Sequence, residues 1–365
     1  MINVVTEKIK SLCNLRIRFD FPKSKQILQL DEYFSDTLKK IIKKDFNVIP
    51  QRKREVYFWI LIKQIIFFDF KFSTYLKNFI KFTSTKIVIT LIDNNPNFYK
   101  LKNLIENVCF ISIQSGLRIP STMNIKKLKN LKCDYFFLQN KYLLAEYKKK
   151  IKCKYYILGN YKNNIYEIKK TKYKNSYLFL GMGVQNWHRM RVGISHKLLS
   201  LLATYFVKSN TKLNILLKNT NIAGQNKEIE FYKKFFKSNC IFYRSNSSKQ
   251  SYKILDEFEN IIFTNTTLGF EAISRKKKVA VFSVNKDKIE KKLFGWPKKY
   301  QKNYKFFLAN KLTYGEIKRV LDNINNCKQA KWEKKYYRDI KDLMYFDRNN
   351  TQLNNVINKV LKNSV

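Results

Sequence analysis

Short, continuous runs of β-branched and aromatic residues recur along this chain, and longer amphipathic stretches separate them. The clearest run is Lys-Ile-Val-Ile-Thr-Leu-Ile at 86–92, and others lie at 26–30, 108–113, 176–180 and 278–282. A strand that is hydrophobic on both faces is typical of a parallel sheet covered on both sides. Strands alternating with helices predict βαβ units. We therefore expect an α/β fold with parallel sheets.

The pattern occurs as two successive series. The chain has 365 residues, of which 45% are hydrophobic, which is more than one core usually holds. The polar, Lys-rich segment 163–175 has no apolar period and is the best candidate for a domain boundary. We expect an N-terminal domain at 1–165, a C-terminal domain at 176–345, and a last helix at 346–365 that can cross back to the first domain. Further strands are expected at 135–138, 155–158, 213–217 and 261–263, and helices at 32–44, 56–68, 98–106, 192–208, 228–237, 269–275 and in the tail 313–365.

Two α/β halves of this kind favour two Rossmann-like domains that face each other across a cleft. Ligands of open parallel sheets bind outside the carboxyl ends of the strands. The sequence therefore predicts a site between the domains.

Lys and Arg total 73 against 27 acidic residues, which gives a net charge of +46. Such a field attracts nucleic acid or anionic lipid. The lysines are spread over the whole chain, however, and Lys, Asn, Ile, Phe and Tyr are abundant together, as an AT-rich coding bias would produce. The charge by itself names no partner.

The cysteines give no metal site. Six cysteines lie far apart without a CxxC pair, and His188 and His196 are the two histidines, so no familiar zinc spacing can be assembled. Residues 1–18 lack the apolar stretch of a signal peptide. The longest apolar run, 56–72, is interrupted by polar residues and is too broken to span a bilayer. We expect a cytoplasmic, reducing environment.

The most informative stretch is IIFTNTTLGFEAISRKKKVAVFS at 261–283, in which a buried strand, a polar turn, a helix and a second buried strand follow one another. Thr266 and Thr267 would present hydroxyls and backbone N–H groups at the helix start, where the dipole favours phosphate. Gly269 would let backbone approach a ligand, and Glu271 could accept hydrogen bonds from ribose hydroxyls. The alternative is ordinary helix-start chemistry, with a threonine as the N-cap.

This stretch resembles the donor-site turn of GT-B glycosyltransferases. More specifically, it is similar to the bacterial surface carbohydrate biosynthesis protein family, whose relatives include retaining Kdo transferases acting on CMP-Kdo. Three other motifs match that family: VITLIDNN followed by FISIQSGLR within 88–118, YILGNYKNN at 156–164, and FGWP at 294–297. Ser115 and Lys276 depart from the family pattern, in which Asn and Gly are usual.

In the first half, Asp93 ends one predicted strand, and Gln114 and Arg118 follow the next. In a parallel sheet these side chains face the cleft. Asp93 could then act as a base or nucleophile toward a sugar, and Arg118 could pair with a carboxylate or phosphate. The alternative is that Asp93-Asn-Asn-Pro is a turn before the next helix.

In the second half, the resemblance places the turn of Gly181 and Gly183 near the donor phosphates. Lys218 ends a strand and could neutralise a phosphate. His188 could serve as acid, base or phosphate ligand, although a lone histidine is often structural. Trp296 could stack on a base or sugar, or it could plug the space between the domains.

The resemblance implies a glycosyltransferase of surface polysaccharide, such as lipopolysaccharide or capsule, that needs no metal or other cofactor. A nucleotide-sugar such as CMP-Kdo would be the donor. An oligosaccharide or a lipid-linked glycan at the inner face of the cytoplasmic membrane would be the acceptor. Independently of the resemblance, a basic surface with Phe, Tyr and Trp near it would favour peripheral attachment to anionic lipid there. The alternatives are a polyol-phosphate transferase on the same fold, a basic protein that binds nucleic acid or anionic membrane, and a non-catalytic scaffold.

Overall fold

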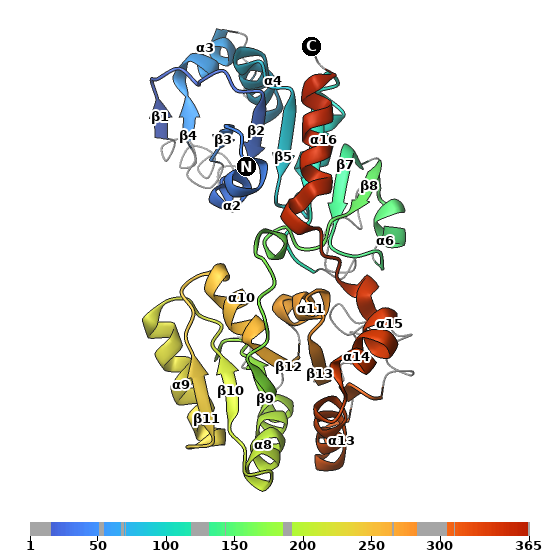
Figure 1. The fold of residues 1–365 in the computed structure, drawn as a ribbon. Coiled ribbons are helices and arrows are strands. Elements are labelled where there is room, and N and C mark those ends of the chain that lie inside the picture. The colour runs from blue at the N-terminus through green and yellow to red at the C-terminus, as the bar shows by residue number, and fades with distance from the viewer. Residues whose placement is uncertain are drawn as a thin grey trace.

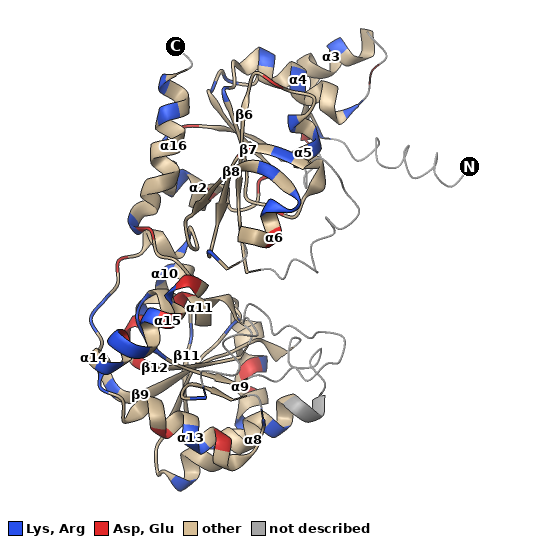
Figure 2. Cartoon of the chain, turned by 90° about the vertical axis from the view of Figure 1, so that its right-hand side faces the viewer, with Lys and Arg blue, Asp and Glu red and all other residues tan. Residues whose placement is uncertain are grey.

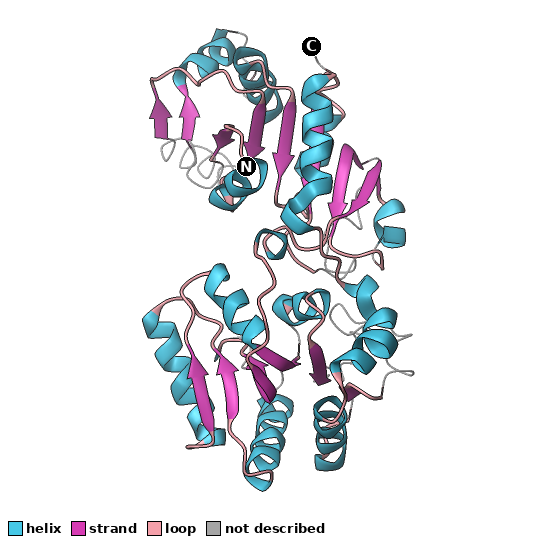
Figure 3. Cartoon of the chain, viewed as in Figure 1, coloured by secondary structure: helices cyan, strands magenta, loops and turns pink. Residues whose placement is uncertain are grey.

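The computed structural model describes residues 16–50, 55–66, 69, 71–117, 131–142, 144–184, 192–264, 266–282, 305–309 and 311–363. They form two domains, and in each one helices pack around a parallel six-stranded sheet (Figures 1 and 3). The expected α/β class with two Rossmann-like domains is confirmed.

The first sheet has the strand order β3-β2-β5-β6-β7-β8, and all of its pairs are parallel. A separate parallel pair, β1 and β4, lies beside it. The elements are β1 Arg16–Arg18, β2 Ile27–Leu30, α2 Ser35–Ile42, β3 Asn47–Ile49, β4 Glu55–Tyr57, α3 Phe58–Ile66, α4 Phe72–Thr83, β5 Ile87–Thr90, α5 Pro96–Lys102, β6 Cys109–Ile113, β7 Leu131–Leu138, α6 Leu144–Lys148 and β8 Ile151–Ile157.

The hydrophobic run of β5 is continuous because both faces of the sheet are covered. Val88 packs into a core with residues of α3, α4, α5 and α6. Ile87 and Ile89 point to the opposite face, where they pack with residues of α2 and of the last helix, α16. All three side chains are fully buried.

The second sheet has the order β11-β10-β9-β12-β13-β14, which is the Rossmann order 3-2-1-4-5-6. The elements are β9 Tyr173–Leu180, α8 Val192–Lys208, β10 Leu213–Leu216, α9 Ile222–Phe236, β11 Cys240–Tyr243, α10 Ser248–Glu257, β12 Phe258–Phe263, α11 Thr267–Ser274, β13 Lys278–Phe282, β14 Leu308–Ala309, α13 Tyr314–Asn325, α14 Gln329–Lys331, η4 Trp332–Tyr337, α15 Arg338–Ile340, η5 Lys341–Leu343, η6 Arg348–Asn350 and α16 Thr351–Lys362.

The chain crosses between the domains twice. It passes outward through η3 (Asn163–Ile165) and returns before α16, which runs alongside β5 of the first domain (Figure 1). Gly159 and Phe346 form a β-bridge where the two crossings meet. A Cβ at Gly159 would lie 2.0 Å from the Tyr345 carbonyl oxygen, so glycine is required at this position.

Several elements differ in position from those predicted from the sequence, and others were not predicted. The expected helix at 56–68 begins only at Phe58, because 55–57 pairs with β1. The helix expected at 98–106 is α5, which begins two residues earlier at Pro96, with the Asn95 side chain as its cap. The helices α4 and α10 and the strand β11 were not expected at all. Within the described parts of the chain, no helix is long and apolar enough to cross a membrane.

Candidate functional site

The carboxyl ends of the two sheets point toward each other (Figure 1). A hydrogen bond joins these two edges: the Asn160 side-chain amide, just after β8, donates to Glu271 of α11. The order of the second sheet reverses between β9 and β12, which is the switch point where open α/β sheets bind ligands. The predicted residues Gly181, Gly183, Thr266 and Thr267 follow these two strands.

The turn after β9 is tight. The Gly181 N–H donates to the Leu216 carbonyl at 2.9 Å, and a Cβ at Gly181 would approach that oxygen to 2.8 Å. Gly183 has φ +74°, a conformation that strongly favours glycine. The two glycines therefore hold this turn close against the end of β10.

A buried acid shapes the neighbouring turn after β10. The Glu228 carboxylate accepts hydrogen bonds from the backbone N–H groups of Lys218 at 2.9 Å and Asn219 at 2.7 Å. Burial raises the pKa of Glu228, and these hydrogen bonds oppose the rise. These bonds fix the backbone of Lys218, whose side chain is exposed at the rim of a cavity.

That cavity has a volume of about 520 Å³ and lies between the turns after β9 and β10 and the start of α9. The Asn221 side chain caps α9 by accepting from the Gly224 N–H at 2.7 Å. The lining is Met182, Gly183, Val184, Lys218, Asn219, Thr220, Asn221, Ala223, Gly224 and Lys227. Two lysines, glycine backbone and a helix start are groups that attract anions.

The turn before α11 lies next to this cavity, because the Thr264 hydroxyl contacts the sulfur of Met182. Thr266 occupies the N-cap position, and its side chain makes no capping hydrogen bond. Thr266 therefore stands at the predicted cap position but does not form the capping hydrogen bond. Thr267 is the first residue of the helix and is partly exposed. The first N–H groups of α11 are thus not capped by Thr266.

Gly269 and Glu271 both make close contacts inside the protein. A Cβ at Gly269 would lie 2.2 Å from the Phe263 ring, so this glycine serves packing inside the domain. Glu271 lies in the second turn of α11 and is 4% exposed. It accepts hydrogen bonds from Asn160 and, at 2.8 Å, from the Tyr252 hydroxyl. Burial raises the pKa of Glu271, while the Tyr252 hydrogen bond and nearby cations lower it.

Lys162 belongs to the same region and was missed from the sequence. Burial lowers the pKa of its ammonium group to about 8, and its charge interacts with those of Glu271 and Lys218. The Asn160 side chain accepts from the Lys162 backbone N–H at 2.9 Å, and the ammonium lies 3.0 Å from the centre of the Phe34 ring. In a chain so rich in lysine, no local pattern marks this one.

At the edge of the first sheet, Asp93 is fully buried. One carboxylate oxygen accepts from the Ser115 N–H at 3.2 Å and the Ser115 hydroxyl at 3.3 Å, and the other accepts from the Tyr147 hydroxyl at 3.4 Å. A substrate cannot reach the carboxylate in this conformation. Asp93 thus orders the turn after β6. The alternative considered from the sequence is also present, because residues 93–96 form a turn in which the Asn95 side chain caps α5.

Gln114 is also fully buried and shares Tyr147 with Asp93, since its amide donates to that hydroxyl at 3.3 Å. Its side-chain oxygen accepts from the Gln139 N–H at 2.9 Å, and Gln139 returns a bond to the Gln114 carbonyl at 3.2 Å. The structure therefore brings Asp93 and Gln114 together as parts of one internal network. The predicted site residues Arg118, His188 and Trp296 lie outside the described residues.

Tyr161, between the two edges, is a further residue that the sequence did not indicate. The side chain is fully buried, and its hydroxyl has no hydrogen-bond partner among the described residues. Burial and the charges of nearby acids, Asp93 and Glu271 among them, raise its pKa. An unsatisfied buried hydroxyl is uncommon in folded proteins and can indicate a place where a ligand supplies the missing partner.

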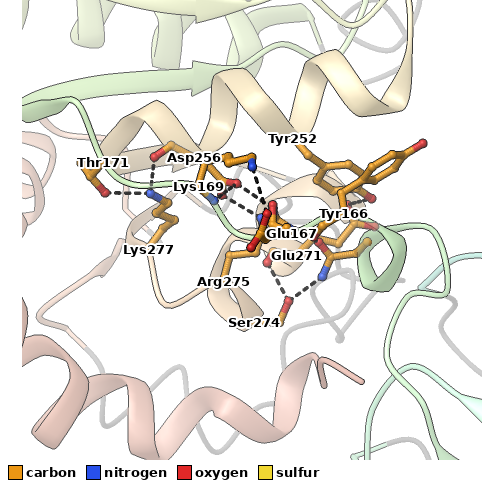
Figure 4. Close-up of polar contacts among 11 residues, drawn as sticks. Tyr166, Glu167, Lys169, Thr171, Tyr252, Asp256, Glu271, Ser274, Arg275 and Lys277 are labelled. Carbon is orange, nitrogen blue, oxygen red and sulfur yellow. Dashed lines mark hydrogen bonds and ion pairs between the residues drawn. The ribbon is translucent and has the colours of Figure 1, made fainter. Parts of the chain in front are cut away.

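A buried ion pair fixes the first interdomain crossing to the second domain (Figure 4). Arg275 contacts Asp256 through two nitrogens, at 2.8 and 2.6 Å, and both side chains are almost fully buried. The same guanidinium donates to the carbonyls of Tyr166 and Glu167 and to the Asn163 side chain. The predicted linker 163–175 is therefore held by specific hydrogen bonds at its start.

Comparisons with known proteins agree with this architecture. Residues 193–361 match a family model described as "putative O-antigen biosynthesis protein". No curated protein matches the chain.

Three solved structures share the fold over nearly the whole chain. They are UDP-GlcNAc 2-epimerase from Methanocaldococcus jannaschii (TM-score 0.53, 10% identity, covering 91% of this chain and 99% of that one), S. aureus MnaA with UDP (0.51, 12%, 93% and 97%) and a glycosyltransferase from Rickettsia africae (0.50, 12%, 94% and 100%). The chain therefore has the GT-B fold, and its residues 193–361 are similar to O-antigen biosynthesis proteins.

Proposed function

We propose that this chain transfers a sugar from a nucleotide-activated donor to a glycan acceptor in the biosynthesis of bacterial surface polysaccharide. One observation carries the proposal: near the switch point of the second sheet, the turn of Gly181 and Gly183, the exposed Lys218 and the start of α9 border one cavity, and the turn before α11 contacts Met182 beside it. Backbone N–H groups and a cation at such a place stabilise the negative charge of a leaving phosphate.

The donor would lie along this edge, with its phosphates near Gly181, Gly183, Lys218 and the Thr266–Thr267 turn. The sequence resemblance favours a CMP-sugar such as CMP-Kdo, whereas the neighbour from S. aureus holds UDP. Because Lys218 and Lys162 supply positive charge, we propose that transfer needs no divalent metal. Transfer that persists in EDTA would support this point, and loss of transfer would contradict it.

The first sheet would face an oligosaccharide or lipid-linked acceptor at the inner face of the membrane. Asp93 and Gln114 would act as positioning residues there, since both are buried and hydrogen-bonded within the domain. Arg118, His188 and Trp296 remain candidates for contact with the donor.

Isothermal titration calorimetry with CMP, CDP, UDP and GDP tests the donor site. We expect one nucleotide to bind, and Lys218→Ala to weaken it about tenfold, which is about 1.4 kcal/mol and typical of a lost charge-assisted contact. Lys212→Ala is the matched control, because Lys212 is an exposed lysine at the opposite end of the same strand, β10. Its affinity should equal that of the wild type.

The absence of nucleotide binding, together with salt-dependent retention on DNA, would contradict the proposal and favour the nucleic-acid alternative. Lys and Arg are scattered over helices of both domains in Figure 2, whereas a nucleic-acid-binding protein is expected to concentrate them. Mass spectrometry of the products separates the enzyme classes. Sugar transfer supports the proposal, and polyol-phosphate transfer supports the alternative on the same fold. An epimerised donor without an acceptor would indicate the activity of the M. jannaschii neighbour.

A further inference from the structure

The helix α3 is apolar around most of its circumference, yet only Ile60 and Gln64 are buried. A helix with apolar residues on all sides normally lies inside a protein or a membrane. In α3, Trp59, Ile65 and Ile66 are 39%, 50% and 62% exposed. Something outside the described chain is therefore expected to cover this helix.

Exposed apolar side chains from neighbouring segments extend this surface. We call it the aromatic patch and define it by Ile17, Phe19, Phe21, Trp59, Ile65, Ile66, Phe72 and Phe82, each more than a third exposed. These residues come from β1, the chain that follows it, and the hairpin of α3 and α4. In Figure 1 these helices lie on the side of the first domain that is remote from the second domain.

The rings of the aromatic patch are held in fixed positions. The Phe21 ring stacks on Trp59 with the centres 4.9 Å apart and on Phe82 at 5.9 Å. The Trp59 indole N–H donates to the Phe19 carbonyl at 2.7 Å, and the Phe19 ring lies 5.1 Å from Phe58. Exposed apolar side chains gathered on neighbouring elements in this way mark interaction sites. Since the rings are already ordered, binding there would cost little conformational entropy.

Cations on the same elements indicate the chemistry of the partner. Lys63 of α3, Lys71 just before α4, and Lys77 and Lys81 of α4 are all exposed. The acids of these segments are already engaged: Asp20 pairs with Arg18 at 2.6 Å, and Asp69 accepts from Thr74 at 2.6 Å. Exposed lysines on the same helices as exposed aromatic and aliphatic side chains match the boundary between acyl chains and anionic headgroups.

We propose that the aromatic patch inserts into the surface of an anionic lipid bilayer and so docks the first domain on a membrane. The reason for such docking rests on the proposed function, because a lipid-linked acceptor lies in a membrane. The binding itself involves no donor, acceptor or residue of the candidate site.

Flotation of the purified protein with vesicles tests the proposal. We expect binding to vesicles that contain phosphatidylglycerol and much weaker binding to phosphatidylcholine alone. The double variant Ile65→Ser/Ile66→Ser should reduce the bound fraction at least about tenfold, because two aliphatic side chains no longer leave water. Val207→Ser is the control: Val207 is 58% exposed on α8 of the second domain, and this change should have no effect.

A second pair of variants tests the electrostatic part. Lys63→Glu/Lys77→Glu should lower binding to anionic vesicles and leave the fold intact, since both side chains are exposed. Lys212→Glu on the second domain should change little. If the serine variant is unstable, these charge reversals decide the matter, with thermal unfolding as the check on folding.

Three outcomes would overturn the proposal: equal vesicle binding by wild type and patch variants, binding that ignores anionic lipid, or a dimer in light scattering that the serine variant abolishes without any effect on vesicles. The last would make the patch an interface between two copies.

Nucleotide affinity measured without vesicles should be unchanged in the patch variants, and Lys218→Ala should still float with vesicles. Failure of the lipid proposal and failure of the donor-site proposal are therefore distinguishable.

Discussion

The two sheets end at the same place in the molecule, but their carboxyl edges differ in kind. At the first edge, Asp93 and Gln114 are fully buried, and both are hydrogen-bonded to the Tyr147 hydroxyl. At the second edge, Lys218 is exposed, and the turn after β9 borders an open cavity. The first edge is a closed polar network, and the second presents charge and backbone to a ligand.

This difference shows that a polar residue at a strand end does not by itself indicate contact with a substrate. At a closed edge the polar groups hydrogen-bond to each other, and this network makes the edge rigid. At an open edge they face solvent, and a ligand can take up their hydrogen bonds. Substitutions at the first edge should therefore act on folding, and those at the second on binding.

The largest effect is expected at the joint between the domains. Arg275→Met leaves the buried Asp256 carboxylate without its ion-pair partner and frees the linker carbonyls. Loss of one partner of a buried pair costs about 3–5 kcal/mol of unfolding free energy. Urea denaturation measures it. Lys276→Met is the control, because its partner Glu333 is 37% exposed and such pairs contribute at most about 1 kcal/mol. Equal losses in both variants would contradict the role given to Arg275.

A smaller effect is expected at the closed edge. Asp93→Ala leaves the Ser115 N–H, the Ser115 hydroxyl and the Tyr147 hydroxyl without an acceptor, which should cost about 2–3 kcal/mol. Nucleotide affinity should stay within about twofold of wild type, since a stable fold leaves the second edge unchanged. Full stability combined with complete loss of transfer would show instead that Asp93 touches the substrate as a base.

Much of the fold could be predicted from the sequence because buried parallel strands are locally visible. The runs that became β5, β6, β13 and the second half of β9 are short, continuous and rich in β-branched or aromatic residues. The start of α10 was missed, although Ser247 and Gln250 fit the pattern of a helix cap and the Ser247 side chain does accept from the Gln250 N–H. The strand β4 was not visible, because its partner β1 is about forty residues away.

The site was harder to predict, because its contacts join distant parts of the sequence. Asn163 was placed at the start of the predicted linker, and Asn160 was noted only as part of the motif at 156–164. They nevertheless bind Glu271, Ser274 and Arg275, which lie more than a hundred positions later. Glu271 was expected to face ribose because the helix start could not be fixed to the residue. With the helix starting at Thr267, its side chain turns inward to Tyr252.

The smallest effect is expected from titration of Lys162 between the two edges. Burial lowers the pKa of its ammonium group to about 8, so the folded protein loses this charge as the pH rises through that value. A nucleotide phosphate binds the charged form better. Affinity should therefore be highest below pH 8 and fall a few-fold above it, by an amount set by one partly screened charge.

Lys162→Arg separates this titration from others in the chain. A guanidinium stays charged at every accessible pH, so the affinity of the variant should no longer depend on pH between 7 and 9. Lys277 also has its pKa lowered to about 8 by burial, but it contacts Thr171 and Asp256 inside the second domain and is unchanged in this variant. If the affinity of Lys162→Arg still depends on pH, the titrating group is Lys277 or the nucleotide itself. That result would contradict a contact between Lys162 and the bound nucleotide.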